Sequence, residues 1–304
     1  MMKNIRIADL FELVDGEYEL HGDPNRSFSD VRPVGMESDS SLVWISPSEN
    51  EKERVVKKTC ASVVLGDWSL LECDLPKDKT FLIVEDPRLV FARIMKVFFR
   101  TEPNPGIDPS SVVHLEARIA ETASIGPLTI VGRCSIEANC RISGNVTIYD
   151  DVEIGKNVSV HSGAVLGVDG FGYARNLLGE FEKIEHVGNL KIGNDVEIFS
   201  NVVIARGTLI TTSIGHGTKI NNNVHIAHNV SISDNVVINA GVTICGSSTV
   251  GKNSLIGPGA VVRDGVNIGS GSVLGMGSVL TSDMPDGETW IGVPARLQRD
   301  FHNG

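Results

Sequence analysis

Aromatic side chains are scarce in this sequence. Only 5% of its 304 residues are Phe, Trp or Tyr, whereas glycine occurs 32 times. This composition favours a core filled by Ile and Val, with many tight turns, over a globule packed around rings. The chain also lacks a basic excess, because its net charge is −11. A phosphate-binding surface needs clustered Lys and Arg, so we expect no nucleic-acid partner.

Long apolar runs and paired cysteines are missing as well. No stretch reaches about 18 apolar residues, so we expect no membrane span. The N-terminal segment carries acidic residues and no apolar signal core, which predicts a cytoplasmic protein. The five cysteines are odd in number and match no metal-ligand spacing, so we expect no metal site. Cys134 and Cys140 fall on small inward positions of a repeat and are predicted to be core thiols.

A six-residue repeat dominates what is present. From Ile214 to Leu280 an aliphatic residue occupies every sixth position, followed four residues later by a small or β-branched one, with Gly, Asn, Asp and Ser between them. A period of six fits neither a helix nor one long strand, so it indicates short strands joined by turns, three to a triangular coil. The pattern predicts a mainly β chain: a left-handed parallel β-helix of about nine coils.

The repeat extends towards the N-terminus with interruptions. Hexads begin at Ile107, shift phase by one residue before the run from Ile130 to Leu166, and resume from Ile192 to Ile210 before a slip of two. Residues 1–100 instead mix helical spacing with short apolar runs, which predicts a small α/β domain. We therefore expect this domain, a Pro-rich linker at 101–111, the β-helix at 107–282 with a loop inserted at 168–189, and a tail at 283–304.

The inserted loop is too polar and too aromatic to form a further coil. It contains Phe171, Tyr173 and Phe181 among several glycines. Long loops within regular scaffolds are often functional, so we expect it to fold over a site. The alternative is a flap that contacts a neighbouring subunit.

One histidine and one glycine occupy the same hexad position in successive coils. His228 lies on a face or corner of its hexad, and Gly246 follows one 18-residue coil later at the same position. A histidine can take the proton from an attacking amine or hydroxyl, and a glycine N–H can donate to the oxyanion. The alternative is a surface histidine on a polar corner. His225 and His216 either face the same groove or lie on the surface.

Two arginines near the C-terminus can meet phosphates. Arg296 and Arg299 lie beyond the last hexad, where they can bind the phosphates of coenzyme A or of a carrier protein's phosphopantetheine. The alternative is that both are solvated.

These motifs resemble the UDP-3-O-acylglucosamine N-acyltransferase family of hexapeptide-repeat enzymes. The resemblance covers nearly the whole chain and is carried by HSGAVLGVDGFGYA (161–174) and IAHNV (226–230). It implies a homotrimer with active sites between neighbouring prisms, His228 as general base and Gly246 as oxyanion donor. It also implies that Phe171 and Tyr173 shape the acceptor site.

The sequence departs from the family pattern at several substrate positions. Asn221-Asn222 replaces Asp-Asn, although we still expect it to contact the substrate. Gly265 replaces a second histidine, and Val43, Ser46 and Glu49 stand where the family holds uracil. A GVPAR ending, similar to that of coenzyme-A-dependent sugar acetyltransferases, replaces the family's terminal helix.

These observations favour an N-acyltransferase that acts on another nucleotide-linked amino sugar of the cell-envelope polysaccharide or lipopolysaccharide. The thioester donor is acyl-CoA or acyl carrier protein, with no bound cofactor. Three alternatives remain: the lipid A enzyme itself, a sugar O-acyltransferase, and a non-enzymatic scaffold.

Overall fold

The computed structural model describes residues 4–46, 48, 51–101 and 103–298. The chain divides into two compact units, Met1–Glu102 and Pro103–Gly304. In the N-terminal unit, a five-stranded sheet of order β2-β7-β6-β5-β4 is parallel except for β2. Its elements are β1 (Ile5–Arg6), η1 (Ile7–Leu13), β2 (Tyr18–His21), β3 (Ser27–Phe28), β4 (Asp30–Val31), β5 (Ser41–Trp44), α1 (Lys52–Lys58), β6 (Val63–Gly66), η2 (Trp68–Glu72), β7 (Thr80–Val84), α2 (Pro87–Ile94) and η3 (Met95–Phe99).

Both faces of this sheet are covered, as expected for parallel strands. Alternate residues of β6 enter different cores: Val63 and Leu65 pack with helix α2, whereas Val64 packs with Val56 of α1. Proline at the start of α2 and the Asp86 carboxylate, which accepts a hydrogen bond from the Leu89 N–H, begin that helix. The apolar segment near the N-terminus forms the 3₁₀ helix η1 rather than an α-helix.

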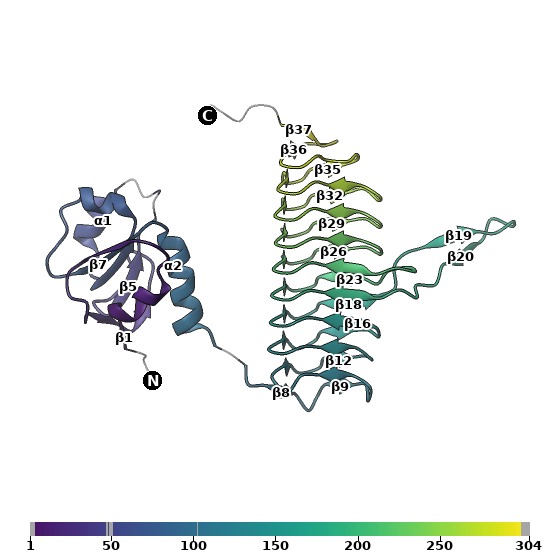
Figure 1. Ribbon diagram of the computed structural model, residues 1–304, viewed down its shortest axis with the longest axis horizontal. Helices are drawn as coiled ribbons and strands as arrows, with labels where there is room; N and C mark the ends of the chain where they lie inside the picture. The colour runs from purple at the N-terminus through teal and green to yellow at the C-terminus, as the bar shows by residue number, and fades with distance from the viewer. Residues whose placement is uncertain (1–3, 47, 49–50, 102, 299–304) are drawn as a thin grey trace. The chain divides into compact units, whose positions relative to one another are not determined.

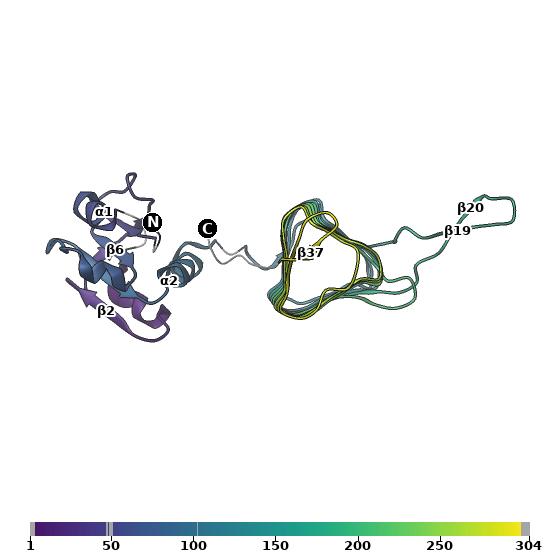
Figure 2. The same cartoon turned by 90° about the horizontal axis from the view of Figure 1, so that it is seen from above.

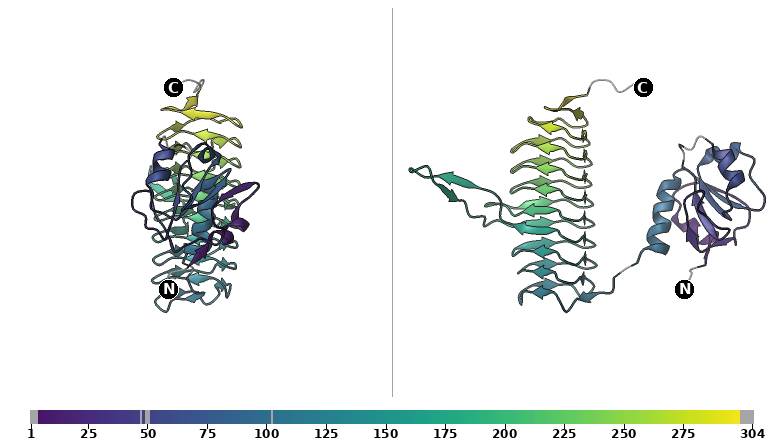
Figure 3. Two further views of the ribbon diagram at one scale, coloured as in Figure 1. Left: turned by 90° about the vertical axis from the view of Figure 1, so that its left-hand side faces the viewer. Right: turned by 180° about the vertical axis from the view of Figure 1, so that it is seen from behind.

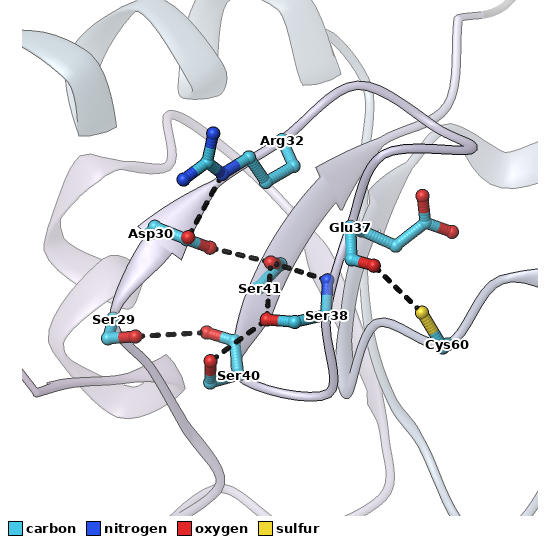
Figure 4. A network of polar contacts seen from close by, with 8 residues as sticks. All are labelled: Ser29, Asp30, Arg32, Glu37, Ser38, Ser40, Ser41 and Cys60. Atoms are coloured by element: carbon cyan, nitrogen blue, oxygen red, sulfur yellow. Dashed lines mark hydrogen bonds and ion pairs between the residues drawn. The ribbon is translucent and has the colours of Figure 1, made fainter.

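Polar contacts attach the edge strand β4 to β5 (Figure 4). The Ser41 hydroxyl donates to Asp30 Oδ1 at 2.6 Å, and Arg32 Nε lies 3.0 Å from Oδ2 of the same carboxylate. The Ser41 hydrogen bond is the main cause that holds the pKa of Asp30 below its usual value. Nearby, the Cys60 thiol donates to the backbone carbonyl of Glu37 at 3.0 Å.

The C-terminal unit is a triangular parallel β-helix (Figures 1 and 2). Face 1 consists of β8 (Gly106–Ile107), β11 (Ser124–Ile125), β14 (Arg141–Ile142), β17 (Ser159–Val160), β22 (Glu197–Ile198), β25 (Lys219–Ile220), β28 (Val237–Ile238), β31 (Leu255–Ile256), β34 (Val273–Leu274), β36 (Thr289–Ile291) and β37 (Arg296–Leu297). Face 2 consists of β9 (Val112–Val113), β12 (Ile130–Val131), β15 (Thr147–Ile148), β18 (Val165–Val168), β23 (Val203–Ala205), β26 (His225–Ile226), β29 (Thr243–Ile244), β32 (Val261–Val262) and β35 (Val279–Leu280). Face 3 consists of β10 (Arg118–Ile119), β13 (Ser135–Ile136), β16 (Val152–Ile154), β21 (Leu190–Ile192), β24 (Thr212–Ile214), β27 (Ser231–Ile232), β30 (Thr249–Val250) and β33 (Asn267–Ile268).

The hexad aliphatics form the core of this unit. Each one stacks on its counterpart in the next coil, as Ile226 pairs with Ile244 and Ile244 with Val262. Cys134 and Cys140 lie in the same core, which confirms their prediction as core thiols. Burial raises the pKa of Cys134 to about 12 and that of Cys140 to about 11. Parallel pairing also continues past Leu280, where Leu274 pairs with Trp290.

The predicted inward orientation is wrong for two residues. Ile130 is 52% exposed, and its neighbour Val131 is buried instead, so the short hexad follows Val131 rather than preceding Ile130. Ile210 is 62% exposed, because residues 206–211 leave the coil as a loop between β23 and β24. In both places an aliphatic residue continues the six-residue period in the sequence, although the backbone has changed phase there.

The loop inserted at 168–189 contains a β-hairpin. Strands β19 (Tyr173–Arg175) and β20 (Phe181–Lys183) pair antiparallel, and the hairpin extends away from one corner of the prism (Figures 2 and 3). The chain enters it from β18 on face 2 and returns to β21 on face 3. The hairpin therefore emerges from the corner between these faces, which we call the 2–3 corner.

The stacked core predicts that substitutions at two neighbouring positions of one strand change the stability of the protein by very different amounts. Ile238 is fully buried, whereas Val237 on the same strand is 38% exposed. We expect Ile238→Ala to destabilise the protein by about 2–5 kcal/mol through lost burial and a cavity, and Val237→Ala to cost well under half of that. Thermal unfolding measures both. Equal losses would contradict an inward hexad position.

Candidate active site

The 2–3 corner carries the irregular segments of the β-helix. The hairpin leaves the stack there, and one coil later the 206–211 loop does the same between β23 and β24. His228 follows β26 at this corner, and Gly246 follows β29 one coil further. The structure therefore places a histidine, a glycine and two loops along one edge of the prism.

The His228 ring packs against the Gly246 backbone. A Cβ added to Gly246 would lie 2.7 Å from Cε1 and 2.9 Å from Nε2 of His228. Any larger residue would collide with the ring, so this glycine is required for space rather than for its backbone conformation. The Nε2 edge of the histidine thus faces the backbone of the next coil.

The Gly246 N–H has no protein acceptor in the part of the chain that the structure describes. At some corresponding positions a side chain of the next coil caps this N–H: His216 N–H donates to Asp234 at 2.7 Å, and Ser270 N–H donates to Asp286 at 2.6 Å. At others, such as Asp234 and Lys252, the N–H likewise has no acceptor among the described residues. The Gly246 N–H differs from these in having the His228 ring against it. A free N–H beside a histidine Nε2 is the arrangement that can stabilise an oxyanion.

The 206–211 loop supplies a partner for the other ring nitrogen. Thr208 Oγ1 lies 3.5 Å from His228 Nδ1, at the long limit of a hydrogen bond. Asn229, in a left-handed conformation with φ of 60°, accepts a hydrogen bond from the Thr208 N–H at 2.8 Å and donates to its hydroxyl at 3.3 Å. The asparagine after the histidine therefore holds the loop that faces the ring. Periodicity alone does not identify Thr208, because the loop interrupts the repeat.

The two ends of the hairpin also touch His228. A Cβ on Gly170 would lie 2.8 Å from His228 Cβ and Cδ2, and the His186 ring packs edge-on with its centroid 5.3 Å away. His186 is buried at 4% exposure. Sequence reasoning missed both residues, since neither follows the hexad pattern.

Burial is the main cause that lowers the pKa of His228 below its ordinary value, and a positive charge on the neighbouring His186 would lower it further. A histidine with a lowered pKa is neutral at pH 7 and can accept a proton. Burial likewise lowers the pKa of His225.

The other predicted polar residues lie elsewhere on the prism. His225 points outward on face 2. Asn221 and Asn222 follow β25 at the corner between faces 1 and 2, and His216 follows β24 at the corner between faces 3 and 1. His216 accepts a hydrogen bond from the Asn194 N–H at its Nδ1, 2.9 Å away. Within one chain, His216 therefore lies at a different corner from His228.

The aromatic residues of the hairpin contact one another rather than the His228 ring. Phe171 and Tyr173 have ring centroids 5.0 Å apart, and Tyr173 and Phe181 lie 6.1 Å apart. Arg175 lies over the Phe181 ring at 4.2 Å. Phe171 is 87% exposed, so the hairpin presents an apolar surface that its own prism does not cover.

At the C-terminal end, Arg296 is exposed in β37, and its guanidinium donates to the Ala295 carbonyl at 2.7 Å. Arg299 lies outside the described residues. Within the described ranges, no cluster of three or more His, Cys, Asp or Glu side chains is placed to hold a metal ion. In those same ranges, no helix combines the length and apolar character needed to cross a membrane.

The N-terminal unit contains a cavity of about 460 Å³ lined by Trp44, Ser46 and Phe91 among others. Trp44 and Phe91 stack at 5.4 Å, and the indole Nε1 has no partner among the described residues. Val43 is fully buried and does not line the cavity, whereas Glu49 lies outside the described residues. The aromatic side chain that lines the cavity from strand β5 is therefore Trp44, the residue after Val43.

The lowered pKa of His228 can be measured directly. We expect the rate of its carbethoxylation by diethyl pyrocarbonate, followed by peptide mass spectrometry, to rise with a midpoint below 6.5, because burial disfavours the charged ring. A midpoint at or above 6.5 would contradict a lowered pKa for the half-buried His228 ring.

Comparisons with known proteins agree with this architecture. The bacterial transferase hexapeptide model (six repeats) matches residues 133–167 and 247–282. Among solved structures, UDP-N-acetylglucosamine O-acyltransferase from Moraxella catarrhalis superposes with a TM-score of 0.55 at 27% identity, over 63% of this chain and 73% of that one. LpxA from Acinetobacter baumannii gives 0.58 at 26% identity over the same shares.

Curated relatives define the family. The UDP-3-O-acylglucosamine N-acyltransferase of Leptothrix cholodnii is 31% identical over 225 residues, which span 67% of this chain but only 65% of that protein. The enzyme of the same name from Polynucleobacter asymbioticus is 30% identical over 250 residues, or 73% of this chain and 69% of that protein. The chain belongs to the UDP-3-O-acylglucosamine N-acyltransferase family of hexapeptide-repeat transferases.

Proposed function

We propose that the protein is an N-acyltransferase that moves an acyl group from a thioester to the amine of a nucleotide-linked amino sugar. The observation that carries this proposal is the contact between His228 and Gly246, a neutral base beside an uncapped backbone N–H. The curated relatives named above act on an amine, which favours N-acylation over the O-acylation named for the solved structures.

The chemistry follows from these two groups. The amine nitrogen attacks the thioester carbonyl carbon and forms the C–N bond, while His228 Nε2 takes a proton from the nitrogen. The carbonyl oxygen becomes an oxyanion, to which the Gly246 N–H donates. Collapse of this intermediate breaks the C–S bond, and the imidazolium returns its proton to the leaving thiolate. None of these steps needs a metal ion or a redox cofactor.

The N-terminal cavity is the place we propose for the nucleotide base. Trp44 and Phe91 offer an aromatic surface against which a base can stack. Its lining differs from the residues that the family resemblance implies. That difference supports an acceptor other than the lipid A precursor.

We propose a homotrimer because face 2 is apolar on its outer side. Its outward residues are β-branched in every coil except at His225: Val112, Ile130, Thr147, Val165, Val203, Thr243, Val261 and Val279. Face 3 instead presents charged and polar residues, such as Glu153 and Lys191. An exposed apolar face of this length favours association with further copies of the chain.

A threefold axis in front of face 2 would bring different corners together. The 2–3 corner of one copy, with His228, would lie beside the corner between faces 1 and 2 of the next copy, with Asn221 and Asn222. The proposed acceptor site is therefore shared between copies. In this arrangement, residues that lie on separate corners within one chain can contact one substrate.

Removal of the base tests the activity. We expect His228→Ala to lower kcat by about a hundredfold or more, the usual effect of losing a general base, with little change in the KM of either substrate. The assay offers acetyl-CoA, 3-hydroxyacyl-CoA and acyl carrier protein to UDP- and dTDP-linked amino sugars, with release of the thiol as the signal.

His114→Ala, which removes an exposed histidine in the same unit, is the matched control. Gly246→Ala tests the second member of the pair, because the added methyl group would displace the His228 ring and should also lower activity. Full turnover in both site variants would disprove the assignment, and mild base treatment of the product separates an ester from an amide.

Face 2 can be tested without knowledge of the substrate. We expect Val203→Glu to shift the mass in light scattering from three chains towards the single-chain 32.6 kDa, because it places a charge in an apolar contact. Ser213→Glu on face 3 is the control and should leave the mass unchanged. A trimer that tolerates Val203→Glu but not Ser213→Glu would place the interface elsewhere.

A further inference from the structure

His186 has a buried ring nitrogen without a partner. Its Nδ1 lies 2.9 Å from the Ile184 carbonyl, which can only accept, so Nδ1 carries the hydrogen. In the neutral ring, Nε2 is then an acceptor. This atom is buried and has no hydrogen-bond partner among the described residues. An unsatisfied buried acceptor costs stability, so its presence here needs a reason.

The unpartnered nitrogen lies beside the proposed base. A Cβ on Gly170 would be 2.6 Å from His186 Nε2 and 2.8 Å from His228 Cβ and Cδ2, so both side chains lie against the same glycine. The two rings meet edge-on, with an interplanar angle of 63°. Because Gly170 has no side chain, the Nε2 atom of His186 and the ring of His228 approach the same side of one backbone position.

The charge of His228 changes during the reaction. The neutral His228 ring carries no net charge, but the imidazolium formed on proton transfer carries a positive charge. The Nε2 side of the buried His186 ring is the negative end of its dipole, and it lies near that charge where water screens it poorly. Dipoles fixed before the reaction and aimed at a developing charge need no reorganisation.

We propose that His186 is a positioning residue that stabilises His228 as it takes the proton, through a lone pair held towards it by the Ile184 carbonyl. The inference rests on the proposed function and adds a residue to its chemistry. The hairpin then has two roles: its tip presents an apolar surface, and its two ends, Gly170 and His186, set the environment of the base.

Charged groups around the pair are largely neutralised by one another. Asp169, next to Gly170, pairs with Lys183 at 2.5 Å, and Lys183 also lies 3.3 Å from Glu185. Arg206 lies 3.4 Å from Asp151. The other neighbours of His228 are Thr208 of the 206–211 loop and Gly246 of the next coil, neither of which titrates.

A protonated His186 would have the reverse effect on the pKa of His228. A positive charge on His186 would repel a proton on His228 and lower the pKa of His228. A lone pair on His186 attracts the same proton. The direction in which a His186 variant shifts the titration of His228 therefore decides between the two.

Two variants separate the lone pair from the packing. His186→Phe keeps a ring but removes the acceptor, and His186→Gln keeps an oxygen acceptor without the ring. Phe can neither donate to the Ile184 carbonyl nor accept a hydrogen bond, whereas the Gln amide can do both. The two variants therefore separate the polar function of His186 from the packing of its ring. We expect His186→Phe to lower kcat roughly three- to tenfold, with unchanged KM for acceptor and donor, and His186→Gln to retain most of the activity. His114→Phe is the control.

The pH dependence gives a reading that does not require acyl transfer. We expect the midpoint of His228 carbethoxylation to move to lower pH in His186→Phe, and the acid limb of kcat to move with it. A shift to higher pH, or no change in either quantity, would overturn the proposal. If wild-type protein modifies normally at His228 but acylates no sugar in the panel, the proposed function fails while the electrostatic coupling of the two histidines is still measured.

Discussion

Parallel stacking of one coil on the next is the constraint on which the rest of the β-helix depends. Each short strand has its hydrogen-bond partners in the neighbouring coils, and each inward aliphatic residue packs on its counterpart there. A single coil buries nothing by itself, so the stack is cooperative between neighbours. It also fixes outward residues in columns along faces and corners.

This regularity makes the departures from it informative. The coils tolerate insertions only at corners, and the hairpin and the 206–211 loop both use the 2–3 corner. There they enclose His228 with Thr208 on one side and His186 on another. A rigid stack thus supplies the histidine and glycine, while the two irregular segments supply the burial that lowers the pKa of the histidine.

The two units divide recognition and chemistry in the proposed function. The N-terminal unit has an aromatic cavity but no repeat, whereas the β-helix has the base and an apolar face. Family membership accounts for the shared architecture. In that proposal, the residues that differ from the family pattern would contact the substrate, whereas the histidine and glycine proposed for catalysis are retained.

Sequence alone determined the β-helix, because a six-residue period has few physical solutions, and it determined that His228 and Gly246 share a column 18 residues apart. It could not determine where the phase shifts, since Ile130 and Ile210 imitate the period while Val131 and a loop occupy those places. Only the tertiary structure brought His186, Gly170 and Thr208 to the base. These residues lie in irregular segments, whose positions depend on packing against distant coils rather than on local pattern. The same structure separated His216 from His228, because consecutive hexads lie on different faces of the prism.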